Sequence, residues 1–267
     1  MNHQLGGAAF SIAIQSAAPA ADGTMNTYHR EPESTTESAP NSAISANDSQ
    51  TEDQALAQLK NRDLPPEQIE GISRNTPVMK SRKVRLALAA HPHSPRHLAL
   101  HLVREFYTFE LTHFALTSGP APDLKRLADE VLVHRLPSVT LGERISLARR
   151  SSSRVAAALL LDKEARVWRI ALDNARLNEA GVVRALQHAR VSPAFVQQVC
   201  CHGKWSLRRE VRIALLQTAH TPLARALEFA RGFPPAQLRD ILYASRLPER
   251  TKECVRQTTE SRRRTKI

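Results

Sequence analysis

The amino-acid sequence predicts an all-α repeat protein, an α-α superhelix (solenoid) preceded by a disordered N-terminal arm. A five-residue motif, Val-Arg-Ile-Ala-Leu at 211–215, recurs with small changes at 84–88 and 168–172. The arginines of the three copies are 84 and 43 residues apart, so the first interval is close to twice the second. Ala, Leu and Arg, which enter helices readily, dominate from residue 81 onward. An array of helical repeats with one degenerate copy explains this spacing.

The segment that follows each copy predicts a helix boundary. Seven residues after the motif stand Pro95, Glu179 and Pro222, directly preceded by Ser94, Asn178 and Thr221. Ser, Asn and Thr are favoured residue types at helix N-caps. We therefore expect that one helix ends, a short turn follows and a new capped helix begins, three times along the chain.

Residues 1–80 are predicted to be a disordered, acidic arm that is rich in Ser and Thr. They carry five Lys/Arg and ten Asp/Glu, whereas residues 81–267 carry 33 and 16, so the net charges are −5 and +17. Two segments of the arm, 51–60 and 66–72, have short-helix patterns, but neither offers enough apolar surface to fold alone. This layout permits an anionic partner for the basic body, and it also permits the arm to mask that body.

The helical-repeat domain is predicted over residues 81–258, and proline and glycine divide its first half. Pro92 ends the first helix, and Ser118–Pro122 is a firm break. Between them the apolar residues Leu98, Leu102 and Phe106 recur at helical spacing. The helices expected here are 82–90, 94–106, 111–115 and 123–133.

In the second half, Thr140 is expected to begin a helix, and 154–161 is nearly all apolar and therefore predicted to be buried. The later helices are expected at 165–172, 178–187, 192–201, 206–217, 221–231, 234–245 and 247–257. A shift of 127 residues also matches the two ends of the domain: Pro95 with Pro222, Phe106 with Phe233, Leu111 with Leu238 and Ser118 with Ser245. These matches support an internal duplication, in which each unit covers the apolar face of its neighbour. Residues 259–267 are predicted to be a basic tail, either solvated or in contact with nucleic acid or anionic lipid.

The residues quoted above resemble the HEAT-like α-solenoid class, and most of all a group of bacterial proteins with the same motif followed by a capped Pro-containing helix. In that group an Asp-Asn-x-Arg-Leu sequence precedes the next cap, and residues 173–177 match it. The resemblance covers about residues 82–257 and none of the arm. It implies a HEAT-like α-α superhelix and carries no activity with it.

Seven residues form the candidate binding surface, and each has two interpretations. Arg85, Arg169 and Arg212 are expected to stack along one edge, either as a structural ladder or as a row of positive charge for phosphates or acidic peptides. The second cluster is Lys204, Trp205, Arg208 and Arg209. Its tryptophan either fills the joint between two repeats or stacks on a partner's base or side chain.

Two metal-binding patterns are weak. His97, His101 and Glu105 share one helix face, but Glu105 lies two turns from His97, which is far for a single ion. Adjacent Cys200 and Cys201, beside His202, would point about 100° apart on a helix. No motif for nucleophilic catalysis, phosphate-binding loops or paired carboxylates is present. Neither a metal nor a cofactor is therefore predicted.

The leading prediction is a non-enzymatic scaffold that presents a curved surface to a protein partner, with nucleic-acid binding as the alternative. A remote alternative is a HEAT-like DNA glycosylase, for which Trp168, Trp205 and Asp173 are available. The three cysteines and the lack of a clear signal peptide favour the cytoplasm. No apolar run is long enough to span a membrane, and the oligomeric state is left open.

Overall fold

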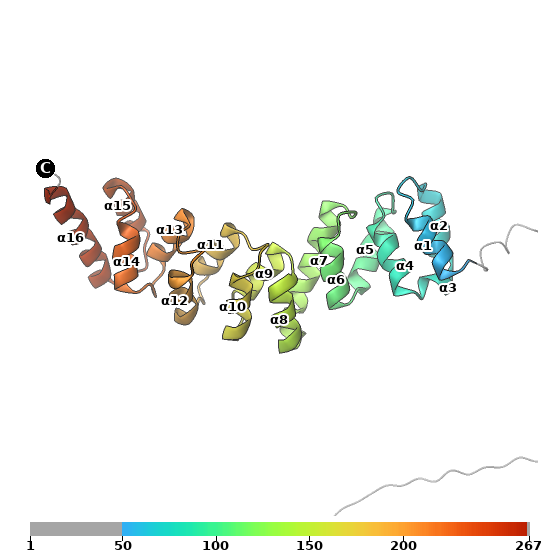
Figure 1. Ribbon diagram of the computed structural model, residues 1–267, viewed down its shortest axis with the longest axis horizontal. Coiled ribbons are helices and arrows are strands. Elements are labelled where there is room, and N and C mark those ends of the chain that lie inside the picture. The colour runs from blue at the N-terminus through green and yellow to red at the C-terminus, as the bar shows by residue number, and fades with distance from the viewer. Residues whose placement is uncertain (1–49, 266–267) are drawn as a thin grey trace, which may run out of the picture. The chain divides into compact units, whose positions relative to one another are not determined.

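A computed structural model describes the backbone of residues 50–265 and the side chains up to residue 258. All of these residues belong to one compact unit, Ile44–Ile267. Within the described range the chain forms sixteen α-helices, one 3-10 turn and no strand, so the all-α prediction is confirmed there (Figure 1). No helix among them combines the length and the apolar character that a membrane span requires.

The helices are short, and most contain eight to ten residues. In chain order they are α1 (Glu52–Leu59), α2 (Pro66–Arg74), α3 (Thr76–Met79), α4 (Arg82–Ala90), α5 (Arg96–Glu105), α6 (Thr108–Leu116), α7 (Pro122–Arg135), α8 (Leu141–Arg150), α9 (Ser153–Leu159), α10 (Ala165–Leu172), α11 (Glu179–Gln187), α12 (Pro193–Cys201), α13 (Arg209–Gln217), α14 (Leu223–Ala230), α15 (Pro235–Tyr243) and α16 (Glu249–Thr265). The 3-10 turn follows α7 at Leu136–Ser138.

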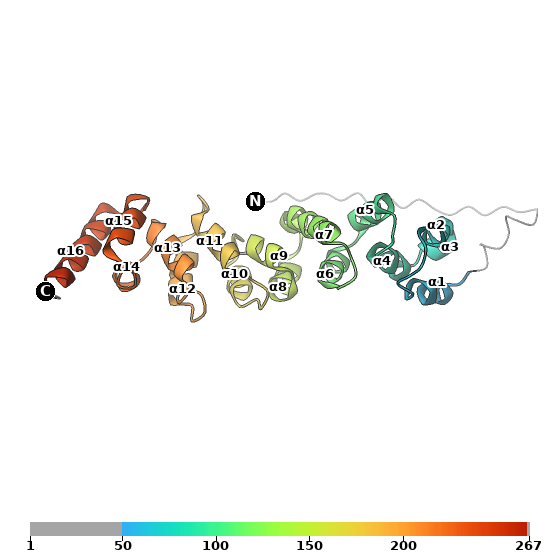
Figure 2. The ribbon, with the colours of Figure 1, turned by 90° about the horizontal axis from the view of Figure 1, so that it is seen from above.

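From α4 onward the helices lie in two rows, because a helix contacts the next helix along the chain and also the next but one. Odd-numbered helices from α5 to α15 contact one another in unbroken succession. In the other row, contacts join α4 to α6, α8 to α10, α10 to α12 and α14 to α16. Figures 1 and 2 show α8, α10 and α12 on one side and α9, α11 and α13 on the other.

The two rows correct the expectation that the motif arginines stack along one edge. Arg85 on α4 and Arg169 on α10 belong to the even row, whereas Arg212 on α13 belongs to the odd row. The physical reason is the repeat length. An interval of 43 residues spans three helices and changes row, whereas the interval of 84 residues spans six and returns to the same row.

The motif keeps its packing role in both rows. Its first position, Val84, Trp168 or Val211, is at most 3% exposed, and its last position, Leu88, Leu172 or Leu215, is at most 1% exposed. Burying one such side chain contributes about 1.5–3 kcal/mol. The apolar face of the motif therefore builds the core wherever the copy falls.

A second regular feature, which we call the C-cap ladder, links each helix end to the helix two positions further on. The last four carbonyl groups of a helix have no partner inside it, which is a large share of a nine-residue helix. Here a side chain from the end of the next helix in the same row donates to them. The pairs are Arg135 to the carbonyls of Arg104 and Phe106 (2.6 Å each), Asn174 to Ala148 (2.8 Å), Trp205 to Leu172 (2.8 Å), Thr218 to Leu186 (3.4 Å) and Ser245 to Leu216 (2.6 Å).

The Asp-Asn-x-Arg-Leu motif is one rung of this ladder. Asn174 is 2% exposed, and its amide nitrogen donates to the carbonyls of Ala148 and Ser151 at the end of α8. Its amide oxygen accepts from the backbone N–H of Arg176, whose guanidinium donates to the carbonyl of Arg150 (3.2 Å). The motif therefore clamps the α10–α11 turn onto the end of α8.

The predicted boundary at residue 81 lies inside a run of packed helices. Helices α1, α2 and α3 precede it, and Ala55, Ile69 and Val78 in them are buried. A ring nitrogen of His91 at the end of α4 lies 2.9 Å from the carbonyl of Asn61. The segment lacks enough apolar surface to fold alone, but α4 covers α1. Residues 1–49 of the predicted arm lie outside the described residues.

Two further expectations need correction. Asn178 caps α11 by accepting from the N–H of Gly181 (2.9 Å), but prolines 95 and 222 occupy the N-cap positions of α5 and α14. Thr221 instead donates its hydroxyl to the carbonyl of Leu215 (2.6 Å), at the end of the preceding helix. At the C-terminus, α16 continues to Thr265, so most of the predicted tail at 259–267 has helical backbone.

Candidate binding surface

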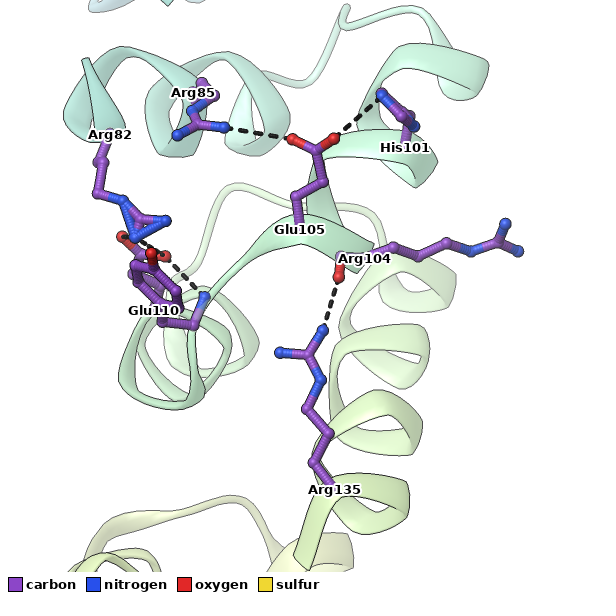
Figure 3. A network of polar contacts seen from close by, with 8 residues as sticks. Arg82, Arg85, His101, Arg104, Glu105, Glu110 and Arg135 are labelled. Carbon is purple, nitrogen blue, oxygen red and sulfur yellow. Dashed lines mark hydrogen bonds and ion pairs between the residues drawn. The ribbon is translucent and has the colours of Figure 1, made fainter. Parts of the chain in front are cut away.

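The first predicted residue, Arg85, lies in a region where cations are neutralised. In this ion-paired region, which comprises α4 to α7, the Arg85 guanidinium contacts the Glu105 carboxylate at 3.2 Å (Figure 3). Arg82 contacts Glu110 at 3.3 Å, and its guanidinium lies 3.4 Å from the centre of the Tyr107 ring. Arg96 pairs with Asp123. Arg85 thus has the structural role that was one of its two interpretations.

The histidine face of α5 offers no metal site. The Glu105 carboxylate already accepts from Arg85 and contacts a ring nitrogen of His101 at 3.3 Å (Figure 3). Among residues 50–265 no three His, Cys, Asp or Glu side chains come close enough together to hold a metal ion. Cys200 is buried, which raises the pKa of its thiol to about 12, whereas Cys201 is exposed.

Both tryptophans belong to the core. Trp205 is 2% exposed and donates its indole N–H to the carbonyl of Leu172. Trp168 is 3% exposed and packs edge-on against the Phe195 ring, with ring centres 5.6 Å apart. Neither ring face is open to a base or to a partner's side chain. The glycosylase alternative therefore loses the aromatic residues on which it depended, and Asp173 contacts His202 at 3.2 Å instead.

The two remaining motif arginines differ from Arg85 and from each other. The Nε of Arg212 donates to the carbonyl of Ser206 (2.7 Å), and its guanidinium lies 5.6 Å from the centre of the Phe229 ring. Arg169 is exposed on α10, with its guanidinium 5.5 Å from the centre of the Trp168 ring. Arg212 therefore supports the α12–α13 turn from beneath, and no contact joins Arg85 or Arg169 to that turn.

The α12–α13 turn, residues 202–208, holds the cations that the structure does bring together. Lys204, Arg208 and Arg209 are all exposed. The ammonium of Lys204 lies 4.2 Å from the centre of the buried Trp205 ring, at its edge of the surface. Arg209 pairs with Glu210 at 3.2 Å, but both side chains are about 60% exposed, so this pair contributes little.

Three neighbouring turns extend this cluster. The α10–α11 turn contacts the α8 end through Asn174, and the α12–α13 turn contacts the α10 end through Trp205. The α14–α15 turn lies against α13, because the Arg209 guanidinium is 5.9 Å from the centre of the Phe233 ring. We call the exposed cations of these four successive turns and adjoining helix ends the basic edge: Arg149, Arg150, Arg176, Lys204, Arg208, Arg209 and Arg231.

The basic edge is strongly positive. Residues 149–231 contain fifteen Lys/Arg and six Asp/Glu, whereas residues 82–135 contain eight and five. Of the seven edge cations, only Arg209 has an acidic partner within the described residues. Four members, Arg149, Arg150, Arg176 and Arg231, were missed by sequence reasoning, because they lie in three other turns. Their position at helix C-termini, where cations are favoured, was the available signal.

A second surface feature is a groove over α9 with a volume of about 450 Å³. Its floor is Ala157 and Ala158 on α9, and α11 approaches so closely that a Cβ added at Gly181 would lie 2.9 Å from the Cβ of Ala157. At its rim, Arg154 pairs with Glu130 (2.9 Å), and Arg184 has no partner. The groove exists because a short, alanine-rich helix lies between two helices with larger side chains.

Comparison with known proteins adds no functional information. No known protein family matches the chain, and no curated protein and no solved structure is significantly similar to it. The basic edge and the groove over α9 are therefore the features on which a function can be argued.

Proposed function

We propose that the chain is a non-enzymatic, macromolecule-binding scaffold of the HEAT-like α-solenoid class, and that the basic edge is its binding surface for an anionic macromolecule. One observation carries this proposal. Six of the seven edge cations have no acidic partner within the described residues, although ion pairs neutralise cations in α4 to α7. Uncompensated charge of one sign on a fixed surface attracts an oppositely charged partner and accelerates its association.

The C-cap ladder supports the proposal, because it holds the cation-bearing turns in place. Asn174 and Trp205 each tie a turn of the edge to the preceding helix end through a buried hydrogen bond. A surface that is ordered before binding loses less conformational entropy when a partner arrives. The cations therefore sit on a stiff support, and only their side chains need to become ordered.

The test compares two triple variants that remove the same charge. One is Lys204→Gln, Arg208→Gln and Arg231→Gln on the basic edge. The matched control is Lys83→Gln, Arg126→Gln and Arg239→Gln, which are exposed cations on three separate helices. We expect the edge triple to elute from immobilised heparin at a clearly lower salt concentration than the control triple. Elution of both triples at the same salt concentration would contradict a localised binding surface.

A second candidate function is the binding of a partner protein, which the groove over α9 favours. Its apolar floor of Ala157 and Ala158 is open, and the unpaired Arg184 offers a partner for a carboxylate. An amphipathic helix with one acidic residue beside its apolar anchors fits this combination.

This second function can be tested with a photoreactive amino acid placed at Ala158 and, as a control, at the exposed Gln197 on α12. Irradiation in the cells that produce the protein should give a defined adduct from position 158 only. Arg184→Glu should remove that adduct. Equal adducts from both positions, or none from position 158, would count against protein binding at the groove.

A further inference from the structure

We propose that the anionic macromolecule is a nucleic-acid duplex, whose phosphate backbone lies along the basic edge without any base being read. This inference rests on the proposed function, since it names the partner class for the same surface. It follows from the arrangement of the edge cations, from their chemistry and from the side chains that surround them.

The edge cations form a line. Contacts through Asn174, Trp205 and Arg209 join each turn to the next in the order α8–α9, α10–α11, α12–α13, α14–α15. Neighbouring helices pack about 8–10 Å apart, so four turns extend over roughly 25–30 Å. That is on the order of eight base pairs of duplex, at about 3.4 Å of axis per phosphate of one strand. A line of this length suits a linear polyanion.

The surroundings of the line disfavour a protein partner there. A stable protein interface has an apolar centre inside a polar rim. Of the large apolar side chains exposed in the described range, only Leu207 lies in these turns, and it is 68% exposed. The other exposed aromatic residues, Tyr107, Phe109 and Tyr243, lie on α6 and α15 or beside them. Charge without an apolar centre is typical of backbone contacts to nucleic acid.

The chemistry of the cations favours phosphate. Six of the seven are arginines, whose planar guanidinium can donate two parallel hydrogen bonds to one phosphate. Arg176 donates one N–H to the carbonyl of Arg150, which directs its side chain along the α8 end and leaves further N–H groups free. Lys204, above the Trp205 ring, adds a point charge in the centre of the line.

The buried tryptophans decide between duplex and single strand. Proteins that bind single strands stack bases on exposed aromatic rings. Trp168 and Trp205 are at most 3% exposed, so no such ring accompanies the edge cations. A duplex has the higher charge density, about one negative charge per 1.7 Å, and needs no stacking. Contacts to phosphates alone carry no base information, so binding should be independent of sequence.

The experiment measures binding by fluorescence anisotropy between 50 and 200 mM salt, as concentrations over which phosphate contacts change affinity strongly. The probes are two DNA duplexes of unrelated sequence, one RNA duplex, oligo-dT, poly-L-glutamate of equal charge and phosphatidylserine vesicles. If about five edge cations contact phosphates, log K should fall with log salt with a slope of about −4.5. The two DNA duplexes should agree within about twofold, and oligo-dT and poly-L-glutamate should bind at least about tenfold more weakly.

The edge triple provides the second readout. Removing three phosphate contacts should reduce the slope by about 2.7, while the control triple should reduce it by less than about 1. Preference for the DNA or the RNA duplex supports the inference in either direction and identifies the source of the backbone. Equal or tighter binding of poly-L-glutamate, oligo-dT or vesicles overturns the inference but leaves the proposed function standing. Absence of binding to every probe at the lowest salt overturns both.

Discussion

The two duplicated segments α4–α6 and α13–α15 share their arginines but not their acids. With the shift of 127 residues, Arg82 and Arg85 correspond to Arg209 and Arg212. Their partners Glu105 and Glu110 correspond to Gly232 and Gln237. One copy is consequently ion-paired, whereas in the other Arg212 bonds a backbone carbonyl and Arg209 has only its exposed neighbour Glu210.

This difference teaches that a repeated arginine does not by itself define a charged surface. The residue type at positions 20 and 28 further along the chain decides whether its charge is compensated. The distance information is already present in the second copy. A Cβ added at Gly232 would lie 3.5 Å from a guanidinium nitrogen of Arg212, which is ordinary contact. The comparison can therefore be broken or sharpened by exchanging a few side chains.

The largest effect is expected from Trp205→Ala, which tests whether the basic edge depends on the ladder. Truncating this buried side chain should lower the free energy of unfolding by about 3–5 kcal/mol, as for other buried aromatic residues. Urea unfolding followed by circular dichroism measures it. Trp205→Phe keeps most of the packing and loses the bond to Leu172, so its loss should be clearly smaller. Equal stability of Trp205→Ala and the unchanged protein would show that this turn is not anchored as described.

Installing the missing acids should convert the second copy into the first. Gly232→Glu with Gln237→Glu places carboxylates beside Arg212 and Arg209, and we expect duplex affinity to fall about tenfold at low salt. Gly232→Gln with Gln237→Glu is no match in charge, so the control is Ala194→Glu with Gln197→Glu on the exposed face of α12. A similar loss in this control would assign the effect to net charge and not to the edge.

Removing the acids from the first copy should make it basic. Glu105→Gln with Glu110→Gln releases Arg85 and Arg82, and we expect duplex affinity to rise a few-fold, less than the loss above because fewer cations surround this site. Each lost pair is partly exposed and should cost less than about 1 kcal/mol of stability. Glu52→Gln with Glu67→Gln, at exposed positions of α1 and α2, is the control of equal charge. No gain over that control would mean that pairing is not what keeps this region inactive.

The smallest effect concerns Asp129, at the joint between α7 and α9. Burial is the main cause that raises the pKa of its carboxyl, although Ser152 donates a hydrogen bond to it (2.7 Å) and so opposes the shift. A carboxyl with a raised folded-state pKa stabilises the fold most at low pH, and this contribution is lost as pH rises through that pKa. Asp129→Asn should therefore stabilise the protein slightly at pH 7, with no gain near about pH 3, below the usual range for Asp. Urea unfolding at both pH values measures the difference, and a less stable variant at pH 7 would show that the Ser152 bond dominates.

Sequence reasoning was right where the deciding interactions are local. The breaks at Pro92 and 118–122 separate helices as expected, and the apolar positions of the motif are buried in all three copies. Of the two interpretations of Trp205, the filled joint between repeats is the one that the structure shows. Helical periodicity and turn residues act over a few positions, so one chain contains the information.

It failed where the deciding contacts are distant. The row of Arg212 depends on how many helices separate it from Arg169, and the folded state of α1 depends on its cover by α4. The edge residues Arg149, Arg176 and Arg231 come together only because the end of each helix meets the end of the next helix in its row. These contacts bridge intervals of some 20 to 33 residues, over which no pattern of residue types is specific.

The three-helix interval between motif copies has a consequence for how such a chain can lengthen. A block of three helices inserted by tandem duplication presents its motif on the opposite side from its parent, whereas a block of six presents it on the same side. Odd blocks therefore give two daughter surfaces that never compete for one partner. Each is free to gain or lose acids under separate selection, and a single ancestral segment can give rise to both an inert side and a binding side.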